Sequence, residues 1–353
     1  TGFAIAAKNY ISALLRSKIK VHYSNLFGIP EGEPLSDNGL VNDARELPPT
    51  MDLPQVVWAQ APLFFKNSGK YKIGHCEFEG VTAPSSWISY CNMMDELWVP
   101  TKWDKEKFEK AGVKVPIYII PQGIDPNYFH PNMAPMKIDA KEKFKFITNA
   151  TWEPRKNLPE LIKAFTSEFS RDEDVCLIVK TMSSALSQPV KKEVEAIKAP
   201  REAARVYVKE FILPPEQMGC FYTTGNCFVL PTHGEGWGLP IFEALACGLP
   251  IITTGYGAPN ETLRDENGEP LPGVHFVDWE EGEAKTSYVY LEGSKWAMPK
   301  PDDLQAKMRF VFENYKEEKK KALKTSEIIR QKFSWDTCTI PIIERLKAIY
   351  ATN

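Results

Sequence analysis

The stretch Val229–Gly248, VLPTHGEGWGLPIFEALACG, constrains the fold of this chain more than any other segment. An apolar run ends at Leu230, a glycine-rich segment follows, and Pro240 is suited to the first position of a helix. Glycines let backbone N–H groups approach a ligand closely, and a helix N-terminus carries about half a positive charge. The pattern therefore predicts a strand, a loop and a helix that together can hold a phosphate.

Two carboxylates lie in this stretch. Glu235 falls in the predicted loop and Glu243 in the predicted first helical turn, with seven residues between them. One carboxylate could face a ligand from the loop while the other accepts hydrogen bonds from a diol such as ribose. A glutamate in a first turn often only compensates the helix dipole, and a Gly-x-Gly-x-Gly pattern alone is a weak signal. The strand–loop–helix context favours the functional interpretation.

Short β-branched or apolar runs alternate with amphipathic stretches along the whole chain, which is typical of an α/β protein with parallel sheets. We expect a long loop over 31–49 and closing helices from Asp302 onward. The expected strands are 19–23, 55–59, 72–76, 96–99, 117–120, 144–148, 175–179, 206–208, 227–230 and 250–253. The expected helices are 5–15, 85–94, 105–111, 159–169, 215–222 and 240–247.

The length of 353 residues favours two domains. Proline and glycine crowd the stretch 116–135, as in an inter-domain hinge. We therefore expect a first domain over 1–125, a second over 126–333, and a C-terminal helix over 334–353 that could cross back to the first. Thr1–Ala4 runs directly into a predicted helix without a preceding strand, which predicts about 5–10 further residues upstream in the natural protein.

Composition excludes several classes of protein. The chain has 43 Lys and Arg against 46 Asp and Glu, which argues against a nucleic-acid binder. We find no apolar run near the ~18 residues that a membrane span needs. The seven cysteines are scattered and never spaced as CxxC, which predicts reduced thiols in a cytoplasmic protein. Peripheral membrane association and a homodimer stay open.

With this context, Glu235 and Glu243 resemble the E-x7-E motif of retaining glycosyltransferases of family 4, which have the GT-B fold of two Rossmann-like, doubly wound domains facing across a cleft. The resemblance covers nearly the whole chain except the loop at 31–50 and a Trp/Glu-rich insertion near 278–300. Four further segments resemble parts of that family: 1–8 (its N-terminal glycine-rich loop), 95–103, 119–129 and 151–158 (its basic segment for the donor diphosphate).

The resemblance implies roles for individual residues. Glu235 would hold hydroxyls of the transferred sugar, and Glu243 would bind the ribose. Lys156 and Arg155 would neutralise the departing diphosphate, so that no metal is needed. The other donor-side residues would be Gly2, Phe3, Lys180, Phe211, Gly236, Trp237, Gly238 and Leu239, and the acceptor side would include His75, Glu79 and His233. Lys156 and Arg155 could instead be a solvated pair, and His75 and Glu79 satisfied polar residues.

The chain also departs from the family pattern. Thr151 stands where many relatives carry an arginine, so that Arg155 could substitute, and Thr1 and Ala4 stand where glycines are common. The DxD-like sequence 172–174 precedes a predicted strand and indicates a solvated turn, because ligands of open α/β sheets bind beyond the carboxyl ends of the strands. Gly255-Tyr-Gly257 lacks the third glycine of a dinucleotide-binding loop.

The sequence therefore predicts a metal-independent retaining hexosyltransferase without a cofactor. Its donor would be a nucleoside-diphosphate sugar, with GDP-mannose favoured over UDP-sugars, and its acceptor a glycan or glycoconjugate hydroxyl. One alternative is a non-catalytic nucleotide-sugar-binding protein on the same fold. A further alternative is another GT-B-type enzyme such as a phosphorylase or an epimerase, although no lysine motif for a pyridoxal cofactor is present.

Overall fold

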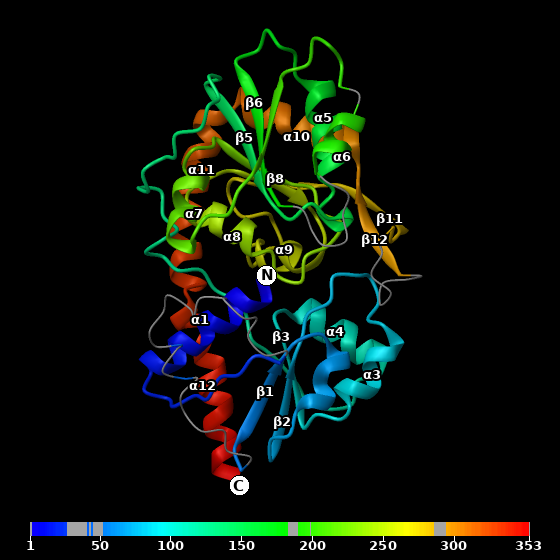
Figure 1. Cartoon of the computed structure of the whole chain (residues 1–353), viewed down its shortest axis with the longest axis vertical. Coiled ribbons are helices and arrows are strands. Elements are labelled where there is room, and N and C mark those ends of the chain that lie inside the picture. The colour runs from blue at the N-terminus through cyan, green and yellow to red at the C-terminus, as the bar shows by residue number, and fades with distance from the viewer. Residues whose placement is uncertain are drawn as a thin grey trace. The chain divides into compact units, whose positions relative to one another are not determined.

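The computed structural model describes residues 2–26, 41, 44, 52–182, 190–197, 199–285 and 294–352. Most of the loop expected at 31–49 therefore lies outside the described residues. The chain divides into two compact units (Figure 1). Unit 1 comprises Thr1–Phe78, Ala83–Gly123 and Lys332–Asn353, and unit 2 comprises Glu79–Thr82 and Ile124–Gln331.

Unit 1 is built on a parallel sheet. Its strands lie in the order β1 (Pro54–Trp58), β2 (Tyr71–His75), β3 (Glu96–Val99) and β4 (Ile117–Ile119). All four were predicted to within one residue at either end. The described helices are α1 (Gly2–Arg16), α3 (Ser85–Cys91), α4 (Lys102–Ala111), α12 (Trp335–Thr352) and the short 3-10 helix η1 (Ala61–Lys66).

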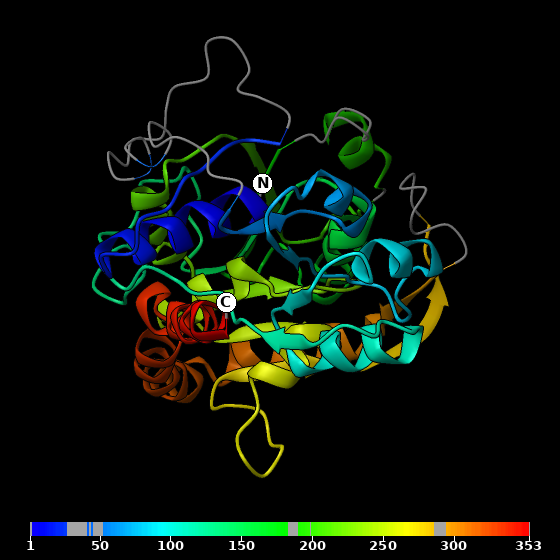
Figure 2. The same cartoon turned by 90° about the horizontal axis from the view of Figure 1, so that it is seen from below.

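The C-terminal helix α12, red in Figures 1 and 2, packs beside α1, blue in the same views. The rings of Tyr10 and Trp335 meet edge to face with centroids 5.1 Å apart. Further along α12, the Arg345 guanidinium donates to the buried carboxylate of Glu96 on β3 over 2.7 Å. These contacts place the last helix of the chain in the same unit as the first.

The strand predicted at 19–23 is wrong, because residues 19–25 form no strand. Lys18 adopts a left-handed conformation with φ 63°, so the chain turns sharply after α1. Val21 and Tyr23 then pack against a cluster that includes Ile11 and Ala44, which buries their apolar surface without pairing in the sheet. The segment Gly2–Ala4, expected from the resemblance as a loop, is the first turn of α1.

Unit 2 contains a six-stranded parallel sheet with the order β10-β9-β8-β5-β6-β7. Its strands are β5 (Phe144–Asn149), β6 (Val175–Thr181), β7 (Arg205–Glu210), β8 (Cys227–Leu230), β9 (Ile251–Thr254) and β10 (Val274–Val277). Within this sheet the chain passes from β5 outward to β7 and returns to β8 beside β5. It then continues through β9 to β10, the strand at the other edge. This is the strand order of a Rossmann fold, in which ligands bind where the order reverses.

The helices of unit 2 are α5 (Leu158–Glu168), α6 (Val190–Ala196), α7 (Pro215–Tyr222), α8 (Leu239–Ala246), α9 (Gly257–Thr262), α10 (Pro301–Glu313) and α11 (Tyr315–Lys332), with a 3-10 turn η2 (Pro154–Lys156). The predicted helices and the helical tail are confirmed, whereas α6, α9 and β10 were not predicted. The predicted α/β class with parallel sheets is confirmed.

The segment near 278–300, expected only as an insertion, forms a two-stranded antiparallel sheet of β11 (Trp279–Glu283) and β12 (Lys295–Pro299). Figure 1 shows this pair as orange arrows beside the main sheet of unit 2. All seven cysteines are free. No helix in the described part of the chain combines the length and apolarity that a membrane crossing requires.

Candidate functional site

The predicted strand–loop–helix element lies at the point where the sheet order of unit 2 reverses, between β5 and β8. The turn after β5 and the loop after β8 are joined by hydrogen bonds. The buried Asn157 side chain donates to the Pro231 carbonyl over 3.1 Å, and the His233 N–H donates to the Arg155 carbonyl over 2.8 Å. Both loops are thus held at the carboxyl edge of the sheet, where a ligand is expected.

Glu235, Lys156 and Arg155 come together there. The Lys156 ammonium lies 2.6 Å from Oε1 of Glu235, and Nη1 of Arg155 lies 3.4 Å from Oε2 of the same carboxylate. Nη2 of Arg155 also reaches Glu79, at 3.3 Å. The side chains are 6% (Glu235), 12% (Lys156) and 15% (Arg155) exposed, so the charges interact with little screening by solvent.

Burial and mutual charge shift the pKa values of this group. Burial alone would raise the pKa of Glu235, but the charges of Lys156 and Arg155 and the hydrogen bond from Lys156 lower it below its usual value. Burial and the nearby Arg155 charge lower the pKa of Lys156, against the attraction of Glu235. Lys156 and Glu235 form a salt bridge, and the carboxylate accepts one of the N–H groups that an ammonium carries.

Glycines allow the loop to pass close to its neighbours. A Cβ at Gly234 would lie 2.3 Å from the Glu79 carbonyl oxygen, and one at Gly257 would lie 2.9 Å from the Glu235 carbonyl oxygen. Gly257 also has φ +73°, which side-chain-bearing residues rarely adopt. Gly257 belongs to the Gly255–Gly257 segment that the sequence excluded as a dinucleotide loop, and its nearness to Glu235 was not predicted.

Helix α8 begins one residue earlier than predicted. Gly238, with φ 96°, precedes the helix, and Leu239 and Pro240 are its first two residues. Glu243 is therefore the fifth residue and lies in the second turn, not the first, because Pro240 does not hold the first position. Trp237 is 2% exposed and stacks on Phe242 with ring centroids 4.6 Å apart, which anchors the loop that also contains Gly236.

A chain of hydrogen bonds links Glu243 to the ends of two strands. The Tyr222 hydroxyl donates to Oε2 of Glu243 over 2.6 Å and accepts from Asn149 over 3.1 Å. The Lys180 ammonium donates to Oδ1 of Asn149 over 3.1 Å. Burial raises the pKa of Glu243 to about 7, against the hydrogen bond from Tyr222 and the charge of Lys180.

Tyr222 and Asn149 were not predicted as site residues, and only their positions at the ends of α7 and β5 could have indicated them. Lys180 lies inside β6, since this strand extends two residues beyond its predicted end. Its ammonium lies over the ring of Phe211, 5.3 Å from the centroid, and burial lowers the pKa of Lys180. Lys180 and Phe211, which were predicted together, are therefore in contact.

The remaining predicted residues lie in three places. His233 precedes the Glu235 loop, and its Nδ1 lies 2.8 Å from the Ala297 carbonyl oxygen on β12. His75 ends β2 in unit 1, where it is fully buried and stacks on Trp58 with ring centroids 3.4 Å apart. Burial lowers the pKa of His75 to about 3, so the ring is neutral at physiological pH. Gly2 and Phe3 lie in the first turn of α1.

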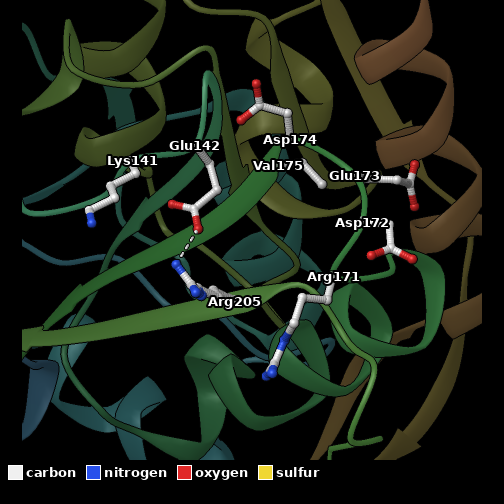
Figure 3. Close-up of a pocket in the computed structure, with 8 residues that line it drawn as sticks. All are labelled: Lys141, Glu142, Arg171, Asp172, Glu173, Asp174, Val175 and Arg205. Atoms are coloured by element: carbon white, nitrogen blue, oxygen red, sulfur yellow. Dashed lines mark hydrogen bonds and ion pairs between the residues drawn. The ribbon is translucent and has the colours of Figure 1, made fainter.

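A second group of charges lies at the opposite edge of the same sheet, around the starts of β5, β6 and β7 (Figure 3). It surrounds a pocket of about 290 Å³ lined by Lys141, Glu142, Arg171, Asp172, Glu173, Asp174, Val175 and Arg205. The DxD-like sequence therefore precedes β6, as predicted. Within the described ranges, no group of three His, Cys, Asp or Glu side chains could hold a metal ion.

Residues 135–281 match the family described as "Glycosyl transferases group 1". The match covers less than half of the chain and shows that this part is similar to glycosyltransferase group 1 domains. It includes Glu235, Glu243, Arg155 and Lys156 and leaves out most of the β11–β12 hairpin.

Two curated relatives match parts of the chain. A probable sucrose-phosphate synthase of Thermosipho melanesiensis is 26% identical over 166 residues, which are 44% of this chain and 36% of that protein. O-antigen chain mannosyltransferase B of Escherichia coli is 24% identical over 139 residues, which are 39% of this chain and 29% of that protein. The chain thus matches about a third of each relative's length, 36% of the first and 29% of the second.

Solved structures resemble a larger part of the chain than these relatives do. A sucrose-phosphate synthase of Thermosynechococcus elongatus has a TM-score of 0.63 at 14% identity, covering 86% of this chain and 74% of that one. HepE of Anabaena, in complex with UDP and glucose, has a TM-score of 0.63 at 14% identity, covering 83% and 77%. These likenesses show the GT-B fold, with its two Rossmann-like domains.

Proposed function

We propose that this protein is a retaining glycosyltransferase of family 4 that transfers a sugar from a nucleoside-diphosphate sugar to an acceptor hydroxyl without a metal ion. The observation that carries the proposal is the buried Lys156–Glu235–Arg155 group at the carboxyl edge of the sheet. An oxocarbenium-like transition state that expels a diphosphate needs fixed positive charge at the leaving group. Lys156 and Arg155 supply that charge in a site with little solvent.

In this proposal, Glu235 binds hydroxyls of the transferred sugar together with the backbone amides of Gly236, Trp237, Gly238 and Leu239. Glu243 accepts hydrogen bonds from the ribose, and Lys180 and Phe211 lie toward the base or a phosphate. The acceptor hydroxyl attacks from the face that the diphosphate leaves, and the departing phosphate takes its proton. Gly2 and Phe3 remain donor-side candidates.

GDP-mannose is the favoured donor, with UDP-sugars next. The basis is the segment Glu153–Asn157, EPRKN, because members of the family that it resembles often use GDP-mannose when they carry this form. The similarity to an O-antigen chain mannosyltransferase agrees with this choice. We assign His75, Glu79 and His233 to the side of a glycan or glycoconjugate acceptor. A cytoplasmic location, with or without peripheral membrane association, fits the free cysteines. The proposal holds for a monomer and for a homodimer alike.

Release of nucleoside diphosphate from GDP-mannose, UDP-glucose and UDP-N-acetylglucosamine tests this function. We expect turnover of at least one donor that persists in EDTA and falls sharply in Glu235→Ala. No turnover of any of the three by the wild-type chain would contradict the proposal. Turnover that vanishes with EDTA would contradict the role of Lys156 and Arg155 while leaving a glycosyltransferase.

One observation favours a second candidate, a non-catalytic nucleotide-sugar-binding protein. The charges of Lys156 and Arg155 are already matched by Glu235 and Glu79, and the exposed Thr151 supplies no further cation. Calorimetric binding of GDP-mannose or UDP-glucose without turnover, across a range of glycan acceptors, would favour this candidate.

A further inference from the structure

The outer edge of β12 touches both segments that place a carboxylate on Arg155. The Ala297 N–H donates to the His233 carbonyl over 3.2 Å, and the Ala297 carbonyl lies 2.8 Å from Nδ1 of His233. Two residues earlier, the Lys295 carbonyl accepts from the Val81 N–H over 3.1 Å. Residues 295 and 297 point their backbone groups to the same side of a strand, away from β11. The edge that an isolated hairpin would expose is therefore paired.

These contacts are placed symmetrically about Arg155. His233 is two residues before Glu235, and Val81 is two residues after Glu79. Both carboxylates contact the same guanidinium, at 3.4 Å and 3.3 Å. The backbones also meet directly, because a Cβ at Gly234 would lie 2.3 Å from the Glu79 carbonyl oxygen. A displacement of β12 would therefore disturb the two backbone segments that place Glu235 and Glu79 against Arg155.

Aromatic packing holds β12 in this position. The buried Trp296 ring stacks on His233 with centroids 5.3 Å apart and an interplanar angle of 11°. On β11, the Trp279 indole donates to the Gly255 carbonyl over 2.8 Å and meets the Tyr256 ring edge to face. The adjoining Ala258 N–H donates to the Glu235 carbonyl over 3.2 Å. The hairpin thus contacts segments on both sides of Glu235.

We infer that the β11–β12 hairpin positions Glu235 and Glu79 around Arg155 and that His233 is the positioning residue through which β12 acts on Glu235. This inference rests on the proposed glycosyltransferase function and adds to it an element that lies mostly beyond the matched residues 135–281. A reacting group displaced by about 1 Å can lose roughly a hundredfold in rate, so this positioning affects turnover more than donor affinity.

Two substitutions of His233 separate its hydrogen bond from its ring. His233→Asn keeps a side-chain donor for the Ala297 carbonyl, whereas His233→Phe keeps a ring against Trp296 and loses that donor. Glu281→Gln is the control, because Glu281 lies on the same hairpin with its side chain 45% exposed and contacts Lys295 at 2.9 Å. Hydrolysis of the donor by water is measured with GDP-mannose and UDP-glucose, so no acceptor contact contributes.

We expect His233→Phe to lower kcat for donor hydrolysis by about tenfold while the calorimetric Kd for the donor stays within about twofold. Glu281→Gln should retain kcat, and His233→Asn, which keeps the hydrogen bond to Ala297, should recover most of the kcat that His233→Phe loses. Amide hydrogen exchange of residues 79–82 and 234–238 should rise in His233→Phe and stay unchanged in Glu281→Gln. If His233→Phe fails to fold, Trp296→Phe, which shortens the stacked ring, should give the same pattern more weakly.

Unchanged kcat and exchange in His233→Phe, with normal turnover by the wild-type chain, would overturn this inference and leave the proposed function standing. A loss of kcat that follows the fall in thermal midpoint across all the variants, Glu281→Gln included, would also overturn it. If the wild-type chain hydrolyses neither donor, the proposed function and the inference fall together. Turnover by the wild type therefore separates failure of the function from failure of the inference alone.

Discussion

In the six-stranded sheet of unit 2, oppositely charged side chains pair both at the carboxyl ends of the strands (the carboxyl edge) and at their amino ends (the amino edge). The two edges differ in how far solvent reaches these pairs. At the carboxyl edge, Lys156 and Glu235 lie 2.6 Å apart with 12% and 6% of their side chains exposed. At the amino edge, Lys143 and Asp174 lie 3.2 Å apart with 90% and 51% exposed. Water screens the second pair and hardly reaches the first.

Burial, more than the presence of charges, therefore distinguishes the candidate site from the pocket in Figure 3. Arg205 and Glu142 face each other across that pocket at 3.4 Å, but Arg205 is 54% exposed. Preorganised charge stabilises a transition state most where the surrounding protein excludes water. The following changes test this difference between the two edges, from the largest expected effect to the smallest.

Lys156→Ala should cause the largest loss. Removing the cation that faces the leaving diphosphate should cost about 2–4 kcal/mol of transition-state stabilisation, measured as kcat/KM for the donor. Lys143→Ala is the matched control at the amino edge and should leave kcat/KM within about twofold. Similar losses in the two variants would show that burial does not distinguish the edges.

Glu243 should make stability depend on pH. Its folded pKa of about 7 lies above the unfolded value of 4.5, so its contribution is fully present below pH 4.5 and is lost as pH rises through 7. Between pH 5 and 8 the contribution should fall by about 2 kcal/mol. Urea unfolding gives the free energy of unfolding of the wild type and of Glu243→Gln at each pH in this range. The contribution of Glu243 is the difference between the two proteins in how this free energy changes with pH.

This difference is needed because burial raises the pKa of Asp104 to about 6, which lies in the same range. Identical pH dependence in the wild type and Glu243→Gln would show that Glu243 is ionised normally. Tyr222→Phe sharpens the test, because loss of its hydrogen bond should raise the pKa of Glu243 further.

Gly257→Ala should reduce both stability and turnover. An alanine in the left-handed backbone conformation of this residue costs about 1–2 kcal/mol. Its Cβ would also lie 2.9 Å from the Glu235 carbonyl oxygen. Gly268→Ala is the control, with φ +82° and nothing within 4 Å of its Cβ. Both variants should unfold at lower urea, and only Gly257→Ala should lose donor turnover beyond that.

Asp172→Asn should have the smallest effect. Asp172 is exposed in the turn before β6, at the edge where the sheet does not present a ligand site. Donor turnover with and without Mn²⁺ should equal that of the wild type. A Mn²⁺-dependent loss of turnover would instead assign a metal to the DxD-like sequence and reverse the roles of the two edges.

Local sequence predicted most elements that build the site. The apolar run 227–230 forms β8, and Pro215–Tyr222 forms α7 with the predicted bounds. Strand 19–23 failed, because its alternating apolar residues pack on α1 instead of joining the sheet. Glu243 lies one residue further into its helix than expected, in the second turn, since Leu239 and not Pro240 is the first helical residue.

The sequence by itself determined the α/β class, the strand–loop–helix element and the presence of Glu235 in its loop, because apolar periodicity, glycine and proline act over a few residues. Only the tertiary structure decided which charges meet. Lys156 and Glu235 are 79 residues apart in the sequence. Tyr222 at the end of α7 and Glu243 in α8 are joined by a hydrogen bond between the two helices. The contact of β12 with His233 spans 64 residues. Burial at such contacts sets the pKa values, and it exists only once the chain has packed.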